Sequence, residues 1–588
     1  MFYIGKRYIC QSALMRKIIS LLACVIISGV LLQYRVINSD IRPGSPPLKV
    51  TLWDAFGYYV YLPSICIYHD YKKLDWLPAI DKKYAVTGGD GYQAMKLDNG
   101  NYTFKYLGGV AILETPFFLI GHFIAKHTNY PPDGFSPPYQ YALGFGVIFY
   151  CILAIFLLRK ILLLYFSDLT TGITLVMVCL ATNFIQYAAV DNGQSHGYIF
   201  PLYVLMLYAT LQWHKKPAPG WALLIGYLIG LGMICRPTEA IMLFIPLMWD
   251  LHNREAARQK WSLVKKHKNH VFLAAVGGMI GILPQLVYWK LTTGSFIFDV
   301  GSKWDFLNPH FRVLFGWEKG WFIYTPVTIL FIAGMFFMKQ LQFKKSVLWF
   351  CLLNIYIIIA WSEWRYGGSY STRALVQSYP LFALPVAAAT ERINLTKWRW
   401  GFYIVCSYLL FVNLFQTWQY DQTILNSDDM NRKYYGRIYL NPNPTPLDMS
   451  MLDNEEILND ESAYYSKILM ASDSVVRIHF DAGASITLFQ GFSLGMSEDK
   501  RWLKVEADIS SNSFWQSFMN LELKLGNSVK HTRSRLFNAI SPDGKTNRYV
   551  FYVSIPPDVK CDDLKLYISD VFTFDGDIHR ISITELNK

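Results

Sequence analysis

Apolar stretches recur through the first 417 residues of the chain, separated by short polar loops. Most are close to the roughly 17–25 residues that a helix needs to cross a bilayer. The pattern predicts about eleven membrane-spanning helices, at residues 18–34, 139–158, 171–189, 197–213, 219–235, 238–250, 271–291, 321–338, 346–362, 374–390 and 399–417. We therefore expect an α-helical polytopic membrane protein, in which the short stretch 238–250 is a tilted or broken helix.

One further apolar stretch, Leu107–Ala125, is left out of this set. It carries Glu114 and Pro116 in its middle, and counting it as a span would place Arg159 and Lys160 outside the cell. We therefore expect an interfacial or re-entrant helix packed on the bundle. The alternative is a true span followed by a segment that folds differently.

The pattern changes after residue 417. Residues 418–470 are polar and rich in turn-forming residues. Beyond about 474, apolar and polar residues alternate, as in Leu521, Leu523 and Leu525 or in Leu564, Leu566 and Ile568. Period-two alternation between turns predicts an antiparallel β-sandwich. The expected organisation is a membrane domain at 1–417 with a long first outer loop at 35–138, a linker at 418–470, and a β-sandwich domain at 471–588.

Charge supports this topology. Charged residues make up only 17% of the 588 residues, and the mean hydropathy is +0.21. The net charge is +12 because 55 Lys and Arg face 43 Asp and Glu, and much of the excess lies in the loops 214–216, 254–268, 339–345 and 391–399. These loops share one side with the N-terminus, which the positive-inside rule assigns to the cytoplasm. We expect no nucleic-acid partner, a multi-pass protein of the cell (inner) membrane, and an extracytoplasmic C-terminal domain.

A carboxylate follows the first predicted span, in the segment Trp53-Asp54-Ala55-Phe56-Gly57. At the outer membrane surface, Asp54 is placed to accept a proton from an acceptor hydroxyl, as a general base does. It is also placed to hold a divalent cation that neutralises a phosphate. The alternative is structural, since Asp before a helical run often caps that helix. No Cys or His cluster with metal spacing accompanies it, so the metal content stays open.

Other polar residues lie at the predicted outer ends of the spans. Lys105 is placed to hold a phosphate, or to snorkel to the membrane surface. Glu114 lies in an apolar run, where it serves either a site or a structural ion pair. Asp191 and His196 flank a span end and suit hydrogen bonds to a sugar or headgroup. Arg236 lies between two spans and faces either an anionic headgroup or nearby Glu239.

The late segment 361–373 combines glycine, hydroxyls, aromatic rings and two arginines at the outer surface. Glycines let backbone N–H groups approach phosphate oxygens, and Arg373 offers a planar fork that matches phosphate. The rings of Trp364 and Tyr366 are suited to stack on sugars. An ordinary interfacial loop in a Trp belt is the alternative.

Together these features resemble the GT-C superfamily of integral-membrane glycosyltransferases. The shared order is one span, a long outer loop with an early acid, an interfacial helix, a multi-span bundle and an outer soluble domain. The resemblance implies that Asp54 is catalytic and that Arg373 holds a lipid phosphate. Two departures stand out: Lys105 to Gly109 replaces a Pro-Pro-Leu-type segment, and the acid is single rather than paired.

The resemblance also implies the reaction. A polyprenyl-phosphate donor would give a hexosyl or pentosyl group, with inversion, to a glycan, lipid or protein acceptor of the cell envelope, with no certain cofactor beyond a divalent cation. The candidate residues are Asp54 for catalysis; Arg373, Lys105 and Arg236 for the donor phosphate; and Tyr58, Tyr106, Glu114, Asp191, His196, Trp364 and Tyr366 for substrate.

Two other functions stay open at this point. A transporter or flippase for a lipid-linked saccharide would show polar groups at mid-membrane and broken helices in paired halves. This chain instead places its charges at the outer surface and has no similarity between its halves. A structural protein that presents the β-domain is the third option.

Overall fold

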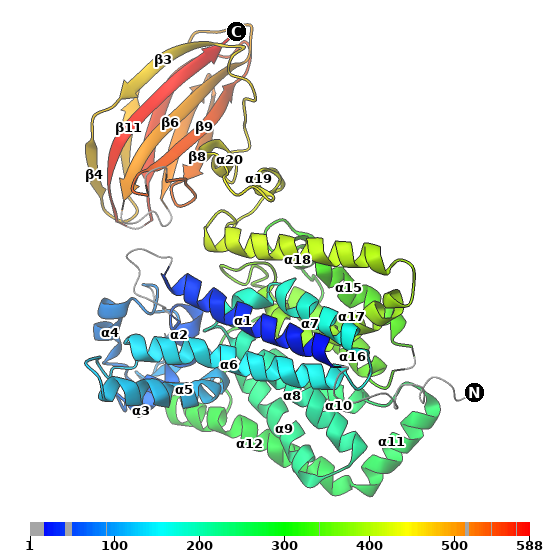
Figure 1. Cartoon of the computed structure of the whole chain (residues 1–588). Helices are drawn as coiled ribbons and strands as arrows, with labels where there is room; N and C mark the ends of the chain where they lie inside the picture. Colours follow the sequence, from blue (N-terminus) through cyan, green and yellow to red (C-terminus); the bar gives the residue numbers. More distant parts are fainter. Residues whose placement is uncertain are drawn as a thin grey trace. The chain divides into compact units, whose positions relative to one another are not determined.

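The computed structural model describes residues 17–40, 50–89, 91–339, 341–511, 517–541, 544–571 and 573–588. The chain forms two compact units, Met1–Thr417 and Trp418–Lys588 (Figure 1). The first is helical and the second is built mainly of β-strands. Each unit is described by itself below.

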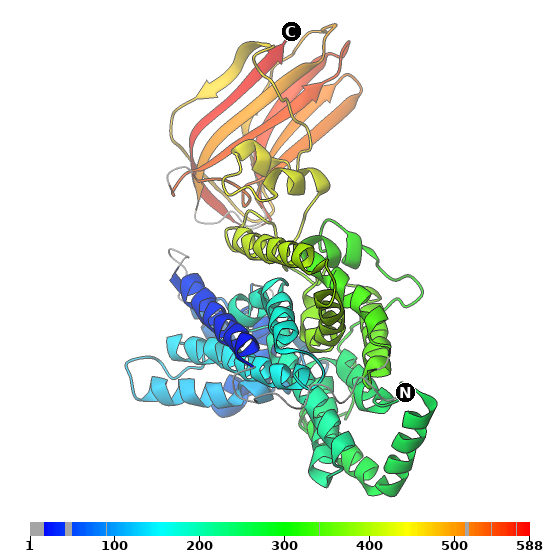
Figure 2. The same ribbon diagram turned by 45° about the vertical axis from the view of Figure 1, so that its right-hand side comes forward.

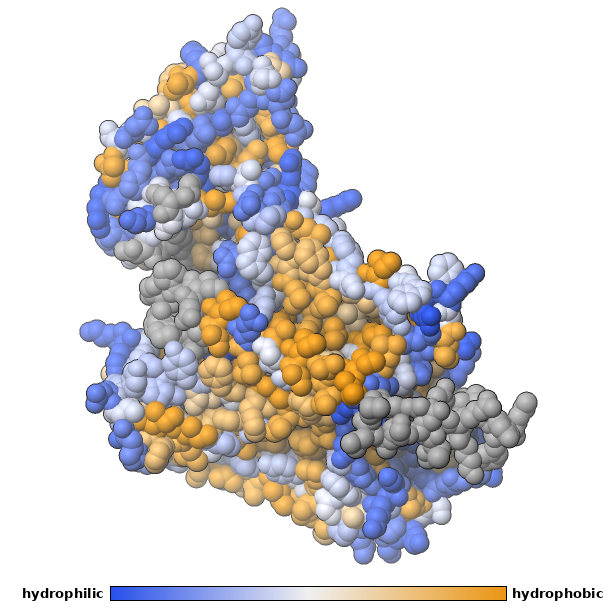
Figure 3. Space-filling view, in the orientation of Figure 1, coloured by the Kyte–Doolittle hydropathy of each residue, from blue (hydrophilic) through white to orange (hydrophobic). Residues whose placement is uncertain are grey.

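The longer helices of the first unit follow the predicted apolar stretches, except for α11, which forms within the basic loop at 254–268. They are α1 (Ile18–Asp40), α5 (Gly109–Lys126), α6 (Pro137–Leu162), α7 (Asp168–Leu180), α8 (Ser195–Lys215), α9 (Pro219–Cys235), α11 (Arg254–Lys266), α12 (Lys268–Thr293), α16 (Lys344–Ile359), α17 (Tyr379–Asn394) and α18 (Arg399–Asp421). Five of the described helices, α1, α5, α6, α12 and α18, are long and apolar enough to cross a membrane. Apolar side chains cover much of this unit's visible surface (Figure 3).

The predicted helix at 107–125 forms as α5, but it has the length and composition of a span. Its interfacial placement and the number eleven therefore stay predictions. Short elements occupy residues 54–104 and later parts of the unit: α2 (Asp54–Tyr59), α3 (Tyr61–Cys66), α4 (Leu77–Tyr84), β1 (Ala94–Lys96), β2 (Tyr102–Phe104), α10 (Phe244–Met248), α13 (Arg312–Phe315), α14 (Trp321–Tyr324) and α15 (Ile329–Ala333).

Several predicted spans are interrupted. The stretch 171–189 forms α7 and then a π-turn, η1 (Gln186–Val190). The stretch 321–338 is divided among α14, α15 and two 3₁₀ turns, η3 (Pro326–Thr328) and η4 (Gly334–Phe337). The stretch 238–250, expected to be broken, forms η2 (Pro237–Leu243) before α10, and 374–390 opens with η5 (Arg373–Ser378). Backbone groups that a helix break frees require partners inside the protein. At the end of α7, the buried amide of Asn413 supplies one, since it donates to the carbonyls of Leu180 and Thr182, both at 2.8 Å.

Helices α9 and α12 approach each other very closely through glycine. Gly226 and Gly230 of α9 face Gly277 and Gly281 of α12, each pair spaced by four residues. A Cβ added at Gly226 would lie 1.8 Å from the carbonyl oxygen of Ala274, and one at Gly277 would lie 2.2 Å from that of Leu223. Small residues at this spacing let two apolar helices pack backbone to backbone where no hydrophobic effect drives them together.

The C-terminal unit is a two-sheet sandwich (Figure 2). One sheet has the order β5-β10-β7-β8, and the other has the order β3-β11-β6-β9, with β4 also paired to β11. The strands are β3 (Tyr465–Ser472), β4 (Val476–Phe480), β5 (Ser485–Gln490), β6 (Arg501–Ser511), β7 (Phe518–Leu525), β8 (Ser528–Arg535), β9 (Asn547–Ile555), β10 (Cys561–Ser569) and β11 (Phe574–Asn587). Leu521, Leu523, Leu564 and Leu566 are buried in the core between the sheets, which confirms the predicted alternation.

The segment before the strands is part of this unit. It contains α19 (Arg432–Ile438) and α20 (Pro446–Ser450). Leu447, Leu458 and Tyr464 pack on Trp502 and Tyr552 of the five-stranded sheet. The outer face of that sheet is therefore partly covered by the chain itself.

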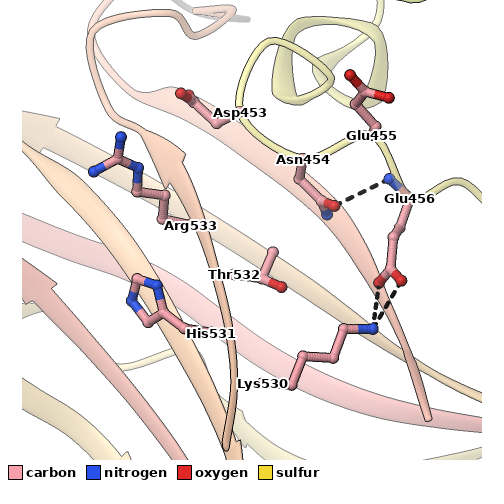
Figure 4. A pocket seen from close by; sticks show the side chains of 8 residues that line it. All are labelled: Asp453, Asn454, Glu455, Glu456, Lys530, His531, Thr532 and Arg533. Atoms are coloured by element: carbon pink, nitrogen blue, oxygen red, sulfur yellow. Dashed lines mark hydrogen bonds and ion pairs between the residues drawn. The ribbon is translucent and has the colours of Figure 1, made fainter. Parts of the chain in front are cut away.

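A pocket of about 440 Å³ lies beside strand β8 (Figure 4). Asp453 and Glu456 line it together with residues 530–533. Its charges are largely paired with neighbours, since Lys530 contacts Glu456 at 2.7 Å and Asp453 contacts Arg535 at 2.7 Å. The side chains that carry reactive chemistry instead gather in the helical unit.

The glycine contact between α9 and α12 predicts a strong effect of one methyl group. In Gly226→Ala, the new Cβ has a backbone oxygen as its neighbour, so the helices must separate along their whole contact. We expect the melting temperature of the detergent-solubilised protein to fall clearly. Gly220→Ala is the matched control, because that helical glycine has nothing within 4 Å and alanine favours a helix by about 1 kcal/mol. Equal melting temperatures for the two variants would show that this close packing is dispensable.

Candidate active site

The structure brings together two predicted residues that lie 319 positions apart. Asp54 is the first residue of α2, and Arg373 is the first residue of η5. A terminal guanidinium nitrogen of Arg373 donates to Asp54 Oδ2 at 2.7 Å, and the two side chains are 12% and 22% exposed. A charged pair that is mostly withdrawn from water requires good geometry and further hydrogen bonds, because desolvation is costly.

The second oxygen of the same carboxylate has its own donors. The hydroxyl of Tyr92 donates to Asp54 Oδ1 at 2.7 Å, and the hydroxyl of Tyr106 donates to Oδ1 at 2.5 Å. The helix-cap alternative for Asp54 is thereby ruled out for this structure, since residue 53 takes the N-cap position and the carboxylate points to these three donors. The two oxygens thus have different partners: Oδ1 binds two hydroxyls and Oδ2 binds a cation.

An unusual backbone conformation places Asp54. Trp53 adopts a left-handed φ of 54°, which is uncommon for a bulky residue and costs energy. Its N–H donates to Val86 at 3.1 Å, and its carbonyl accepts from the side chain of Gln93 at 3.2 Å. Gly88 lies under the indole ring, where a Cβ would come within 2.3 Å of it.

A glycine also seats Tyr106. A Cβ added at Gly57 would lie 2.1 Å from the ring of Tyr106, so this ring occupies the space that a side chain would fill. Tyr58 packs against the same ring, with centroids 4.7 Å apart. The short helix α2 therefore supplies the carboxylate and the surface on which one of its donors rests.

The loop before Arg373 is held from several directions. Lys319 is buried, and its ammonium group donates to the carbonyls of Gly367 and Ser369 at 3.0 and 3.2 Å. Tyr366 and Ser371 both adopt left-handed φ angles, of 57° and 54°. Such strain persists where the surrounding structure enforces it, and it is common at functional sites. The late segment 361–373 is thus a fixed scaffold for Arg373.

Tyr370 is the anchor of this scaffold. Its carbonyl accepts from Tyr187 at 3.1 Å and from Asn183 at 3.2 Å, both from the irregular segment after α7. Its own hydroxyl lies 3.2 Å from Asn413 of α18. The interruption of the predicted helix at 171–189 thus places polar side chains where they hold the loop 361–373, which carries Arg373.

Electrostatics keeps Asp54 ionised. Burial raises the pKa of its carboxyl, but the charge of Arg373 and the hydroxyls of Tyr106 and Tyr92 outweigh burial and lower the pKa to about 2. This folded-state value lies below the ordinary one near 4. The stability that the anion contributes is thus present above about pH 4 and is lost as the pH falls towards 2.

A second arginine lies close by in a polar network. Arg236 contacts His196 Nδ1 at 3.5 Å, and the same nitrogen is 2.7 Å from the side-chain oxygen of Gln377. The amide of Gln377 donates to Glu239 at 3.0 Å. Arg236 also shares a small cavity with Tyr366 and Gln377. The predicted residues His196 and Arg236 therefore contact each other, and His196 is buried.

The remaining predicted residues are more scattered. Lys105 is exposed, and its ammonium lies 5.3 Å from the ring of Tyr92. Glu114 is buried on α5, Asp191 accepts from Gln186 at 3.0 Å, and Trp364 stacks under Arg312 with 4.7 Å to the ring centroid. The Tyr366 hydroxyl is satisfied by the carbonyl of Ile358 at 2.7 Å. Lys105 is linked to the pair through Tyr92, whose hydroxyl donates to Asp54.

Sequence reasoning missed Tyr92, Lys319 and Gln377. Tyr92 follows Gly-Gly-Asp-Gly, which indicates a turn and gives no sign of a partner. Lys319 and Gln377 belong to segments whose strongest signal is their apolar or aromatic content. Among the described residues, no group of three or more His, Cys, Asp or Glu is placed to hold a metal ion.

Comparison with known proteins gives one match to a family. Residues 140–289 match the family model described as Dolichyl-phosphate-mannose-protein mannosyltransferase. This region runs from α6 to α12 and includes His196 and Arg236. No curated protein sequence matches the chain.

Two solved structures are distantly similar. The oligosaccharyltransferase of Archaeoglobus fulgidus in the apo form has a TM-score of 0.42 at 12% identity, over 72% of this chain and 58% of that one. The arabinosyltransferase EmbB of Mycobacterium smegmatis has a TM-score of 0.31 at 10% identity, over 95% of this chain and 64% of that one. The chain thus spans less than two thirds of either.

The family match covers residues 140–289 of the helical unit, so Asp54 and Arg373 both lie outside it. It confirms the predicted resemblance of this chain to the GT-C membrane glycosyltransferases.

Proposed function

We propose that this protein is a membrane glycosyltransferase that takes a sugar from a polyprenyl-phosphate donor and transfers it to an acceptor hydroxyl at the extracytoplasmic face. The single observation that carries the proposal is the contact between Asp54 and Arg373. It places a proton acceptor and a phosphate-binding cation within one hydrogen-bond length of each other. Glycosyl transfer from a phosphate donor needs both groups at one place.

The roles follow from the chemistry of the two side chains. Asp54 accepts the proton of the acceptor hydroxyl as its oxygen attacks the anomeric carbon. Attack from the face opposite to the phosphate inverts the anomeric centre. Arg373, assisted by Arg236, stabilises the lipid phosphate that leaves. The donor's polyprenyl tail lies along the apolar surface of the helical unit (Figure 3).

Asp54→Asn tests the role of the base. The amide keeps the size of the side chain but cannot accept the proton, so we expect transfer to be lost while the protein still folds. Product formation from a panel of polyprenyl-phosphate sugars is the measurement. Asp98→Asn, an exposed carboxylate in the turn between β1 and β2, is the control and should retain activity. Near-normal turnover by a folded Asp54→Asn protein would remove Asp54 from catalysis.

Arg373→Ala tests the donor site. A charge-assisted hydrogen bond contributes about 1.5–3 kcal/mol, so donor binding should weaken by roughly 10- to 150-fold. Arg373→Lys should restore only part of the affinity, because lysine lacks the planar fork. Arg365→Ala, in the same loop, is the control. If the donor dissociation constant does not change in a stable Arg373→Ala protein, the phosphate binds at Arg236 or Lys105 instead.

The topology is tested by labelling from outside the cell. Because the basic loops are assigned to the cytoplasm, we expect single cysteines at the exposed positions 305 and 527 to react with a membrane-impermeant maleimide. A cysteine at the exposed position 259, within α11, should react only after the membrane is opened. Reaction of residue 259 in intact cells would invert the assignment.

A further inference from the structure

The Asp54 carboxylate is divided between two kinds of donor. Tyr92 and Tyr106 both bind Oδ1, at 2.7 and 2.5 Å, whereas Arg373 alone among these binds Oδ2, at 2.7 Å. If Arg373 moves to another anion, Oδ2 loses its partner while Oδ1 keeps both of its own. The oxygen that is then exposed to an acceptor is therefore Oδ2.

We propose that Arg373 passes from Asp54 to the donor phosphate, and that Tyr92 and Tyr106 are positioning residues that keep Asp54 ionised and oriented after this handover. The inference rests on the proposed function and adds that donor binding makes Asp54 available as a base. In the resting protein the base is occupied. It becomes available when a phosphate draws the arginine away.

The two tyrosines are needed when Arg373 leaves Asp54, because the carboxylate then has no cation beside it. A partly buried carboxylate that loses its only cation would take up a proton and would no longer act as a base. Two hydroxyl donors lower the free energy of the anion without neutralising it. They leave Asp54 more basic than in the ion pair, yet still unprotonated near neutral pH.

The reaction balances with these groups alone. The acceptor oxygen forms a bond to the anomeric carbon, and its proton goes to Asp54 Oδ2. The bond between that carbon and the phosphate oxygen breaks, and the lipid phosphate leaves with the electron pair. Arg373, now on the phosphate, stabilises the charge that develops there.

Other polar groups lie near Asp54 without a hydrogen bond to its carboxylate. Tyr58 of α2 and His196 of α8 sense only its charge. Arg236 lies 3.5 Å from His196, and Lys105 lies 5.3 Å from the ring of Tyr92. Among the described residues, direct hydrogen bonds to the carboxylate come from Arg373, Tyr92 and Tyr106. The two tyrosines are therefore the donors that remain after the handover.

The packing of Tyr106 fits this positioning role. Its ring fills the space above Gly57, and its backbone carbonyl accepts from Tyr61 at 2.7 Å. It is thus fixed to the scaffold independently of Arg373. Gly57→Ala would push the ring away and remove one donor without touching Asp54 chemically.

The experiment uses the full-length protein in nanodiscs and farnesyl phosphate, a lipid phosphate without a sugar, as the probe. The dissociation constant and the protons taken up on binding are measured calorimetrically in several buffers at pH 6–8. Subtracting the proton uptake of Asp54→Asn cancels the titration of the probe itself. The variants are Asp54→Asn, Arg373→Ala, Tyr92→Phe, Tyr106→Phe and the double tyrosine variant.

Asp54→Asn should bind farnesyl phosphate about tenfold more tightly than the unmodified protein, because Arg373 no longer has to leave an anion. If Asp54 merely held Arg373 in place, the same variant would bind more weakly. The double tyrosine variant should take up close to one more proton per bound probe at pH 6, as its Asp54 becomes protonated at the handover. Tyr92→Phe and Tyr106→Phe should each show part of this extra proton uptake. The test therefore stays decisive if the double variant does not fold.

Tyr84→Phe is the matched control, because Tyr84 donates to Asp133 at 2.6 Å in the same outer loop. It should behave like the unmodified protein. Unchanged or weaker binding by Asp54→Asn, or proton uptake by the tyrosine variants equal to that of Tyr84→Phe, overturns the handover. Unchanged binding by Arg373→Ala instead shows that the proposed donor site is wrong, so the two failures are told apart.

Discussion

The contact between Asp54 and Arg373 is the interaction on which the organisation of the helical unit depends. It joins the segment that follows α1 to a loop near the end of the bundle, 319 residues later. A partly buried ion pair tolerates little misplacement, since each charge loses water and must find its partner. Backbone with left-handed φ angles, at Trp53 and Ser371, lies next to the pair on both sides.

The support of the pair extends into the bundle. Lys319 and Tyr370 hold the arginine loop through backbone carbonyls, and Tyr187 and Asn183 anchor it to the segment after α7. Breaks in apolar helices are expensive in a membrane unless other groups of the protein satisfy the freed backbone. Here the breaks place polar side chains where the site needs them. The interruption after α7 therefore also supports the site, because its polar side chains hold the loop that carries Arg373.

The closely packed helices and the β-sandwich follow simpler rules. Reciprocal glycines let α9 and α12 meet backbone to backbone, and this pair lies within the region that matches the mannosyltransferase family model. The sandwich is stabilised by an ordinary apolar core between its two sheets. Its pocket beside β8 is lined by charges that are largely paired with neighbours.

Local sequence determined the classes of structure and the site's two main groups. Apolar length marked the helical unit, period-two alternation marked the strands, and composition singled out Asp54 and Arg373. These signals are local, since they depend on which residues lie within one helix or strand. What only the tertiary structure decided is that these two side chains meet, that Tyr92 and Tyr106 complete their contact, and that α7 stops at Leu180. Such facts depend on packing between segments that are not adjacent in the chain, 38 residues apart for Asp54 and Tyr92 and 319 for Asp54 and Arg373. Over such separations neither hydropathy nor spacing carries information about the partner.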